Sequence, residues 1–217
     1  MNPSQRTKVK RVPKRGHYDK ETIYSILDKE FICHVGFVHD GYPVVIPTLY
    51  GRHENKIYLH GSTASRMVRD LQEGIPVSIC VSRVNGLVLA RSAFHHSANY
   101  ESVVLFGTAR LIEGEEQKNQ ALLVVSENVI KGRWDEIRIP NSKELKGTAV
   151  LELEIDEASA KIRTGGPVDD KEDYELDIWA GVLPIIRNYG EPEEDELSTK
   201  SLPVSDSVKK LAGTRID

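Results

Sequence analysis

The segment FICHVGFVHDGYPVVIPTLYGRHENKIYLH, residues 31–60, contains three apolar stretches separated by two polar turns. Residues 31–38 and 44–49 are rich in β-branched and aromatic side chains, which favours strands. The dipeptide Asp40-Gly41 between them is typical of a tight hairpin turn. After a polar turn at 53–55, residues 56–60 predict a third strand. Three strands joined by short turns indicate an antiparallel meander rather than β-α-β units.

The rest of the chain continues this pattern with few interruptions. Asp19 is a suitable cap for a short helix whose apolar face is formed by Ile23, Ile26 and Leu27. Such a mainly β chain with a few covering helices suits a closed barrel, which hides its sheet edges. The sequence predicts further strands at 76–84, 86–89, 103–112, 148–155 and 160–163, and helices at 62–71 and 115–130.

Length and composition set the class of protein. With 217 residues, 39% of them apolar and 29% charged, the chain can bury one core well. The sequence divides into a basic N-terminal extension (1–18), one domain (19–186) and a polar acidic tail (187–217). The extension is expected to be a solvated arm, and loose packing is expected for the tail.

Charge and apolar content also bear on partners and location. The net charge of −4 gives no argument for nucleic acid or an anionic membrane as a partner. No run approaches the roughly 20 apolar residues of a membrane span. Because no apolar segment follows the basic N-terminus, a cytoplasmic protein is expected. Cys33 and Cys80 lie in apolar runs and are expected to be buried, reduced thiols.

One segment has the side chains of a phosphate site. Neither of the common glycine-rich nucleotide motifs is present. Residues 60–66, HGSTASR, stand between a predicted strand and a predicted helix. Backbone N–H groups, the hydroxyls of Ser62, Thr63 and Ser65, and the guanidinium of Arg66 together suit a phosphate. The alternative is an ordinary capped helix with a surface arginine, and spacing alone favours that alternative.

Other chemistry has weaker support. Adjacent side chains on a strand point to opposite faces, so the pair His95-His96 does not indicate a metal site, and no metal is expected. No G-x-S-x-G motif or electropositive cysteine indicates a covalent nucleophile. Trp179 suits either a cap on a planar ring or a plug at the end of the barrel, and the plug is favoured.

Five segments in this order and spacing resemble the FMN-binding split-barrel superfamily. Within it they are similar to the pyridoxamine 5'-phosphate oxidase-like flavoproteins that include the nitroimidazole-resistance proteins, over about residues 17–186. The segments are Gly16-His17-Tyr18-Asp19, VVIPTLY (44–50), IYLHG (57–61) running to Arg66, NYESVVLFG (99–107), and KIRTG (161–165) running to Trp179-Ala180-Gly181.

The resemblance implies a mainly β (α+β) six-stranded antiparallel split barrel with flanking helices. It also implies a homodimer with FMN at the subunit interface. The isoalloxazine is expected along the strand 44–49, and the ribityl phosphate beside the segment 59–66. Ser102 is expected to reach the flavin of the other subunit, although relatives often carry arginine where this chain has Glu101. The residues implied as FMN ligands are Val45, Ile46, Pro47, Thr48, Leu49, Leu59, His60, Ser62, Thr63, Ser65, Arg66, Arg91, Ser102 and Trp179.

The resemblance implies an oxidoreductase that passes hydride or electrons from a reduced nicotinamide through FMN to a small acceptor. His60 is the candidate catalytic residue, with a plain hydrogen bond to the cofactor as the alternative role. Two other functions stay open: a binding module for flavin or heme without turnover, and pyridoxamine phosphate oxidation. The last is disfavoured, because the chain ends in VSDSVKK (204–210) and lacks the Trp and Arg-Leu-rich ending of the true oxidases.

Overall fold

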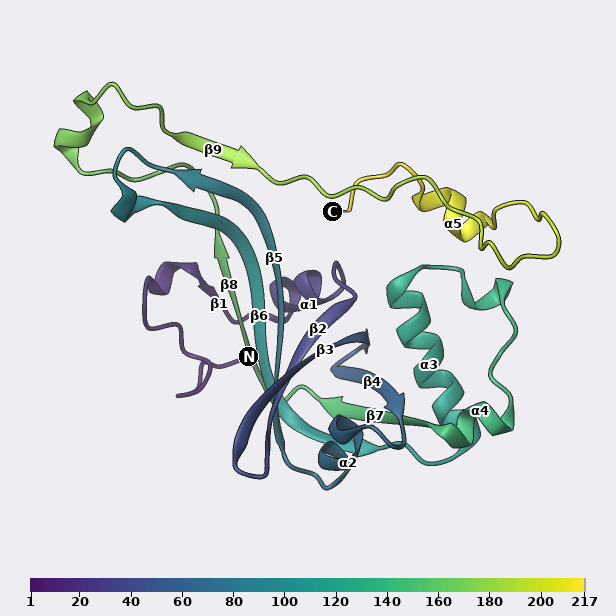
Figure 1. Cartoon of the computed structure of the whole chain (residues 1–217). Helices are drawn as coiled ribbons and strands as arrows, with labels where there is room; N and C mark the ends of the chain where they lie inside the picture. The colour runs from purple at the N-terminus through teal and green to yellow at the C-terminus, as the bar shows by residue number, and fades with distance from the viewer. Residues whose placement is uncertain (217) are drawn as a thin grey trace.

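Six strands close into a ring in this computed structural model, which describes residues 1–216 (Figure 1). Each strand pairs antiparallel with its neighbours, and the pairing of β5 with both β2 and β6 closes the ring. The sequence prediction of a six-stranded antiparallel barrel is therefore confirmed. In order around the ring the strands are β2 (Ile32–His39), β3 (Tyr42–His53), β4 (Lys56–Ser62), β7 (Thr148–Glu154), β6 (Ser97–Leu111) and β5 (Pro76–Leu89).

The strands are longer than the apolar patterns predict. β3 runs without a break to His53, although its last residues are polar, because β4 pairs with it there. β5 continues through the break expected at 85, where a bulge between Val84 and Gly86 takes up the extra residue. The predicted turn at Asp40-Gly41 is confirmed, with φ values of 49° and 80°. Positive φ at both positions matches the right-handed twist of a hairpin.

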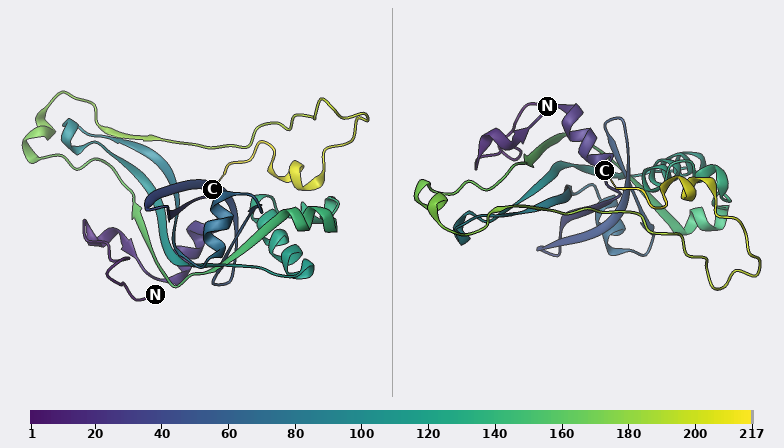
Figure 2. Two further views of the ribbon diagram at one scale, coloured as in Figure 1. Left: turned by 60° about the horizontal axis from the view of Figure 1, so that its bottom comes forward. Right: turned by 90° about the horizontal axis from the view of Figure 1, so that it is seen from above.

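Three shorter strands lie outside the ring. β8 (Glu157–Arg163) pairs with β6, β1 (Gly16–His17) pairs with β8, and β9 (Gly181–Pro184) pairs with β5. The β5–β6 hairpin extends well beyond the barrel, together with β9 and the segment that leads to it (Figures 1 and 2). We call this projection the arm.

Helices cover the outside and one end of the barrel. They are α1 (Lys20–Leu27), α2 (Arg66–Gln72), α3 (Glu115–Val129), α4 (Ser142–Gly147) and, in the C-terminal segment, α5 (Asp206–Leu211). Asp19 caps α1 as expected, since its Oδ1 accepts a hydrogen bond from Thr22 N at 2.8 Å. Gly51 lets α3 approach β3, because a Cβ there would lie 2.7 Å from the Val124 carbonyl oxygen. Among residues 1–216, no helix combines the length and apolarity needed to cross a bilayer.

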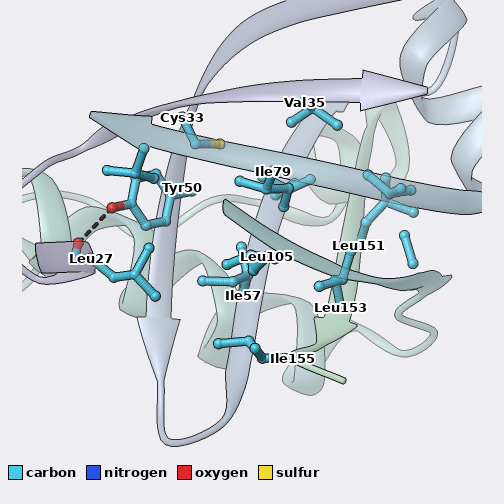
Figure 3. Packing of buried hydrophobic residues seen from close by; sticks show 14 of the residues in the cluster. Leu27, Cys33, Val35, Tyr50, Ile57, Ile79, Leu105, Leu151, Leu153 and Ile155 are labelled. Carbon is cyan, nitrogen blue, oxygen red and sulfur yellow. Dashed lines mark hydrogen bonds between the residues drawn. The ribbon is translucent and has the colours of Figure 1, made fainter. Parts of the chain in front are cut away.

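Apolar side chains fill the barrel and extend to α1 and α2 (Figure 3). Tyr50 is completely buried, and its hydroxyl donates a hydrogen bond to the Leu27 carbonyl oxygen. Burial raises the pKa of Tyr50, so the phenol stays protonated. Burial also raises the pKa of the Cys33 thiol to about 12. Cys33 is fully buried as expected, whereas Cys80 is only half-buried.

Both terminal segments pack against the barrel rather than standing free. In the N-terminal extension, Ser4 and Arg6 both bond to Glu157, and β1 extends the sheet. In the tail, Arg187 forms an ion pair with the buried Glu30. The N-terminal extension is therefore anchored at Ser4, Arg6 and β1, although most of its basic side chains are solvated as expected. Arg6 of the extension meets an acidic partner, Glu157 of β8, whereas Lys8, Lys10, Arg11 and Lys14 are exposed.

Candidate functional site

β3 and β4 pair over only part of their lengths. Their register runs from His53 with Lys56 to Tyr50 with Leu59 and stops there. Earlier in β3, residues 42–49 pair with β2 on one edge. No other strand within residues 1–216 pairs with the second edge of that stretch. We call the opening between the two diverging strands the split; Figure 1 shows β3 starting from the β2–β3 hairpin and β4 running toward α2.

The free edge of β3 exposes a defined set of backbone groups. In an antiparallel pair, successive residues direct their N–H and C=O groups alternately toward and away from the partner strand. Pro43 and Pro47 have no N–H, and prolines are tolerated where that group points away from the sheet. The Tyr50 amide donates a hydrogen bond to the Phe31 carbonyl oxygen at 3.2 Å, on the β2 side of the strand. The backbone groups of even-numbered residues in this stretch face β2, and those of odd-numbered residues, which include both prolines, face the split. Val45 and Leu49 therefore direct both N–H and C=O into the split.

His60 stands on the opposite side of the split. Leu49 and His60 are the first residues beyond the last β3–β4 pair, and His60 pairs with Val150 of β7 on its other edge. The His60 ring is half-buried, and its Nδ1 is buried without a hydrogen-bond partner. Burial lowers the pKa of His60, so the imidazole is neutral at neutral pH. A buried ring nitrogen without a partner fits a site that a ligand completes.

The segment between β4 and α2 forms a turn rather than the helix expected from Ser62 onward. The Ser65 amide donates to the Ser62 carbonyl at 2.8 Å, and α2 begins only at Arg66. Ser65 occupies the capping position, but its hydroxyl makes no capping hydrogen bond. The alternative of an ordinary capped helix therefore loses its main support. Ser62, Thr63 and Arg66 are exposed, so the hydroxyls and the guanidinium predicted to bind phosphate are accessible.

A cleft lies beside the same strand on the outer face of the barrel. It has a volume of about 580 Å³, within the range of small-molecule sites. Four residues that pair with one another across adjacent strands line the cleft: Val45 of β3, Gly36 of β2, Ser78 of β5 and Phe106 of β6. Gly36 keeps this part of the cleft open, because a Cβ there would lie 2.7 Å from Ser78 Oγ.

The remaining predicted residues lie away from the split within one chain. Ser102 is half-buried in the middle of β6, opposite Ser82 and Lys161, and its hydroxyl donates to the Lys161 carbonyl at 3.4 Å. Arg91 pairs with Asp169 on the arm. Only the residues of 45–49 and 59–66 are brought together at the split.

Trp179 does not plug the barrel. It lies just before β9 on the arm, with 69% of its surface exposed. Its ring packs beside Gly181, where a Cβ would lie 3.0 Å from the indole. The expectation of a plug was therefore wrong. The small and apolar neighbours of Trp179 belong to an exposed strand pairing with β5 rather than to the core.

Sequence reasoning did not find an ion-pair network beside β6. Glu30 is buried and pairs with Arg187, and Arg83 lies 3.7 Å from Glu30 and 3.9 Å from Glu101. Glu101 thus faces a cation of its own chain. These residues lie far apart in the sequence, and no local motif joins them.

The barrel, its split and the matching sequence segments define the class of this protein. The chain belongs to the pyridoxamine 5'-phosphate oxidase family, whose model matches residues 19–162. No curated protein sequence matches the chain.

Solved structures extend the similarity beyond the family segment. The flavocytochrome Anf3 from Azotobacter vinelandii is 40% identical with a TM-score of 0.90, covering 98% of this chain and 99% of that one. An FAD and heme binding protein from Mycobacterium smegmatis is 35% identical with a TM-score of 0.88, covering 93% and 98%. A proposed 5-nitroimidazole antibiotic resistance protein from Bacteroides thetaiotaomicron is 25% identical with a TM-score of 0.57, covering 68% and 87%.

Proposed function

We propose that this protein is a flavin-dependent redox protein that binds the isoalloxazine ring along the free edge of β3. The observation that carries the proposal is the unpaired stretch 42–49, where Val45 and Leu49 direct backbone donors and acceptors into the split. The pyrimidine edge of a flavin alternates carbonyl and N–H groups, which such a strand edge complements. An unpaired strand edge also needs a cover, because it otherwise promotes aggregation.

The phosphate of the ribityl chain is assigned to the turn before α2. Arg66 supplies a charge-assisted hydrogen bond, and Ser62, Thr63 and Ser65 supply hydroxyl donors. His60 lies between this turn and the strand edge, so its free Nδ1 is positioned for a neutral hydrogen bond to the cofactor. A bound flavin supplies the hydride and electron transfer, while these side chains hold and orient it.

The flavin could be bound as FMN or as FAD. The sequence favours FMN, because Arg66 suits a terminal phosphate and no dinucleotide motif is present. The Mycobacterium smegmatis protein, which aligns with 93% of this chain, binds FAD. FAD contains the whole of FMN, so the proposed contacts of Arg66 and β3 hold for both. We propose FAD as the resident form, with its FMN half in the site described here.

A second candidate function is heme binding by the same protein. Two structures that align over at least 93% of this chain are a flavocytochrome and an FAD and heme binding protein. The alignment with the flavocytochrome, which covers 98% of this chain, therefore includes β9 and most of the C-terminal segment, which lie outside the family match to residues 19–162. In a protein that binds both flavin and heme, electrons pass from a reduced nicotinamide through flavin to heme or to a small acceptor.

The proposal also includes a homodimer. Apolar side chains are exposed on the outer face of the barrel, at Val38 (60%) and Val45 (64%), and separately on the arm, at Leu183 (55%). Exposed apolar surface of this kind can mark an interaction site. A second copy that covers this face would bring its own Ser102, Arg91 and Trp179 toward the split.

The absorption spectrum of the purified protein tests the proposal. We expect visible flavin bands, release of FAD on denaturation as judged by chromatography against FMN and FAD standards, and a Soret band if heme is bound. Reduction by NADPH with and without an added acceptor separates an enzyme from a carrier. A colourless protein that takes up neither FMN nor FAD in a titration overturns the assignment.

A further inference from the structure

Three side chains able to bind a metal converge at the tip of the arm. His95 belongs to a 3₁₀ turn, Ala93–His95, between β5 and β6. Asp170 and Asp173 lie at the start of a second 3₁₀ turn, Lys171–Glu175, which follows β8. One nitrogen and two carboxylate oxygens from these residues all lie within 4.8 Å of one another. Figure 1 shows both turns at the end of the arm, away from α2 and the split.

His95 supplies an observation independent of the two carboxylates. Its Nε2 is buried and has no hydrogen-bond partner, although it lies 3.3 Å from an Asp170 oxygen. The neighbouring His96 differs, because it is exposed and its Nδ1 lies 3.0 Å from the Ser92 carbonyl. The two rings therefore have separate environments, as expected, but within a turn rather than a strand. Asp170 and Asp173 lie far from His95 in the sequence, so no local pattern around the pair His95-His96 indicates them as ligands.

The carboxylates of the cluster are not used by other groups. Asp169, next in sequence, is fully buried and satisfied by Arg91, whose Nη1 lies 3.1 Å away and whose amide donates at 3.0 Å. Asp170 precedes the second turn, but its side chain does not cap it. Within residues 1–216, neither Asp170 nor Asp173 forms an ion pair with lysine or arginine. Two close carboxylates repel each other, and a cation between them relieves that repulsion.

We infer that His95, Asp170 and Asp173 bind a divalent transition-metal ion. One imidazole and two carboxylates suit ions of borderline hardness such as Zn²⁺, and water completes the coordination. The ion would join the β5–β6 turn to the segment after β8, and so fix the tip of the arm. The site shares no residue with the proposed flavin site and does not depend on it.

Calorimetric titration of the EDTA-treated full-length protein with ZnCl₂ tests the inference. We expect one Zn²⁺ per chain, and a rise in the midpoint of thermal unfolding when Zn²⁺ is added. His95→Ala and Asp173→Asn should weaken binding at least about tenfold, since each removes one of three protein ligands. His96→Ala is the matched control and should bind as the wild type does. Zn²⁺ is the probe because it is not confused with heme iron.

Further measurements show whether weaker binding by a variant results from misfolding. Co²⁺ added to the wild-type protein should give visible ligand-field bands of nitrogen and oxygen coordination, and Mn²⁺ should broaden the NMR signals of His95 more than those of His96. Circular dichroism of each metal-free variant should match that of the wild type. Absence of Zn²⁺ binding to the wild type, or equal binding by the folded His95→Ala variant, overturns the inference.

Discussion

Tyr50 and Leu59 form the last pair between β3 and β4, and the Tyr50 hydroxyl is bonded to the Leu27 carbonyl in the core. Tyr50 is thus fixed to α1 at the residue where the two strands part. The split begins at a rigid point, with Leu49 and His60 on either side of it. A site that must hold a planar ring benefits from such a fixed frame, because less ordering is needed on binding.

The first prediction concerns the phosphate. Arg66→Ala should weaken flavin binding about tenfold or more, because a hydrogen bond to a charged group contributes roughly 1.5–3 kcal/mol. Fluorescence titration of the apoprotein with FMN and with FAD measures the effect. Arg52 of β3 is another arginine but not a suitable control. Its guanidinium donates hydrogen bonds to both carboxylate oxygens of Asp28 and stacks on the Tyr24 ring, so its removal would also lower stability.

Arg138→Ala provides the control for that experiment. Arg138 is exposed and pairs with Glu144 on the surface, so its removal should change stability little. The same loss of flavin affinity in both variants would mean that the phosphate lies elsewhere.

The second prediction concerns the backbone of β3. Val45→Pro removes an N–H that points into the split, but leaves the hydrogen bonds to β2 intact. Val45→Ala removes two methyl groups but keeps the N–H, so it controls for the loss of the isopropyl group. One hydrogen bond contributes roughly 0.5–1.5 kcal/mol, so Val45→Pro should bind flavin about three- to tenfold more weakly than Val45→Ala. Equal affinities would show that the flavin does not use this edge.

Particular residues show how much of this arrangement was predictable. The barrel could be predicted because alternating apolar residues and the turn at Asp40-Gly41 are local signals. Pro43 and Pro47 also carried information, since their spacing shows which backbone groups lie on the free edge. The cluster of His95, Asp170 and Asp173 had no local signal, because a long chain separation hides the contact. Trp179 was misplaced because apolar neighbours indicate burial in a core and in an arm alike.

The third prediction concerns pH. The folded-state pKa of His60 lies below the usual value of about 6.5, because burial disfavours its charged form. The unfolded chain therefore binds a proton at this residue more readily than the folded chain does. As the pH falls below about 6.5, this difference lowers the free energy of unfolding. Denaturant unfolding of the apoprotein should lose less stability between pH 7 and pH 5 in His60→Gln than in the wild type.

The exposed His53 is the control for the pH experiment. His53→Gln should keep the wild-type dependence on pH. If His60→Gln keeps it as well, then His60 is not held neutral in the folded chain.

The last prediction links flavin binding to self-association. If a second copy brings Ser102 and its arm to the split, flavin binds the dimer more tightly than the monomer. Ligand that prefers the dimer shifts the monomer–dimer equilibrium by mass action, and dilution must in turn weaken flavin binding. Sedimentation at several protein concentrations, with and without FAD, measures the linkage.

Ser102→Lys sharpens the same test. Ser102 is only half-buried within one chain, so the longer side chain should be accommodated in the monomer, while it should hinder a partner that covers this face. We expect weaker dimerisation and weaker flavin binding together. A monomer that holds flavin fully at every concentration would show that one chain completes the site, and the dimeric arrangement would then be wrong.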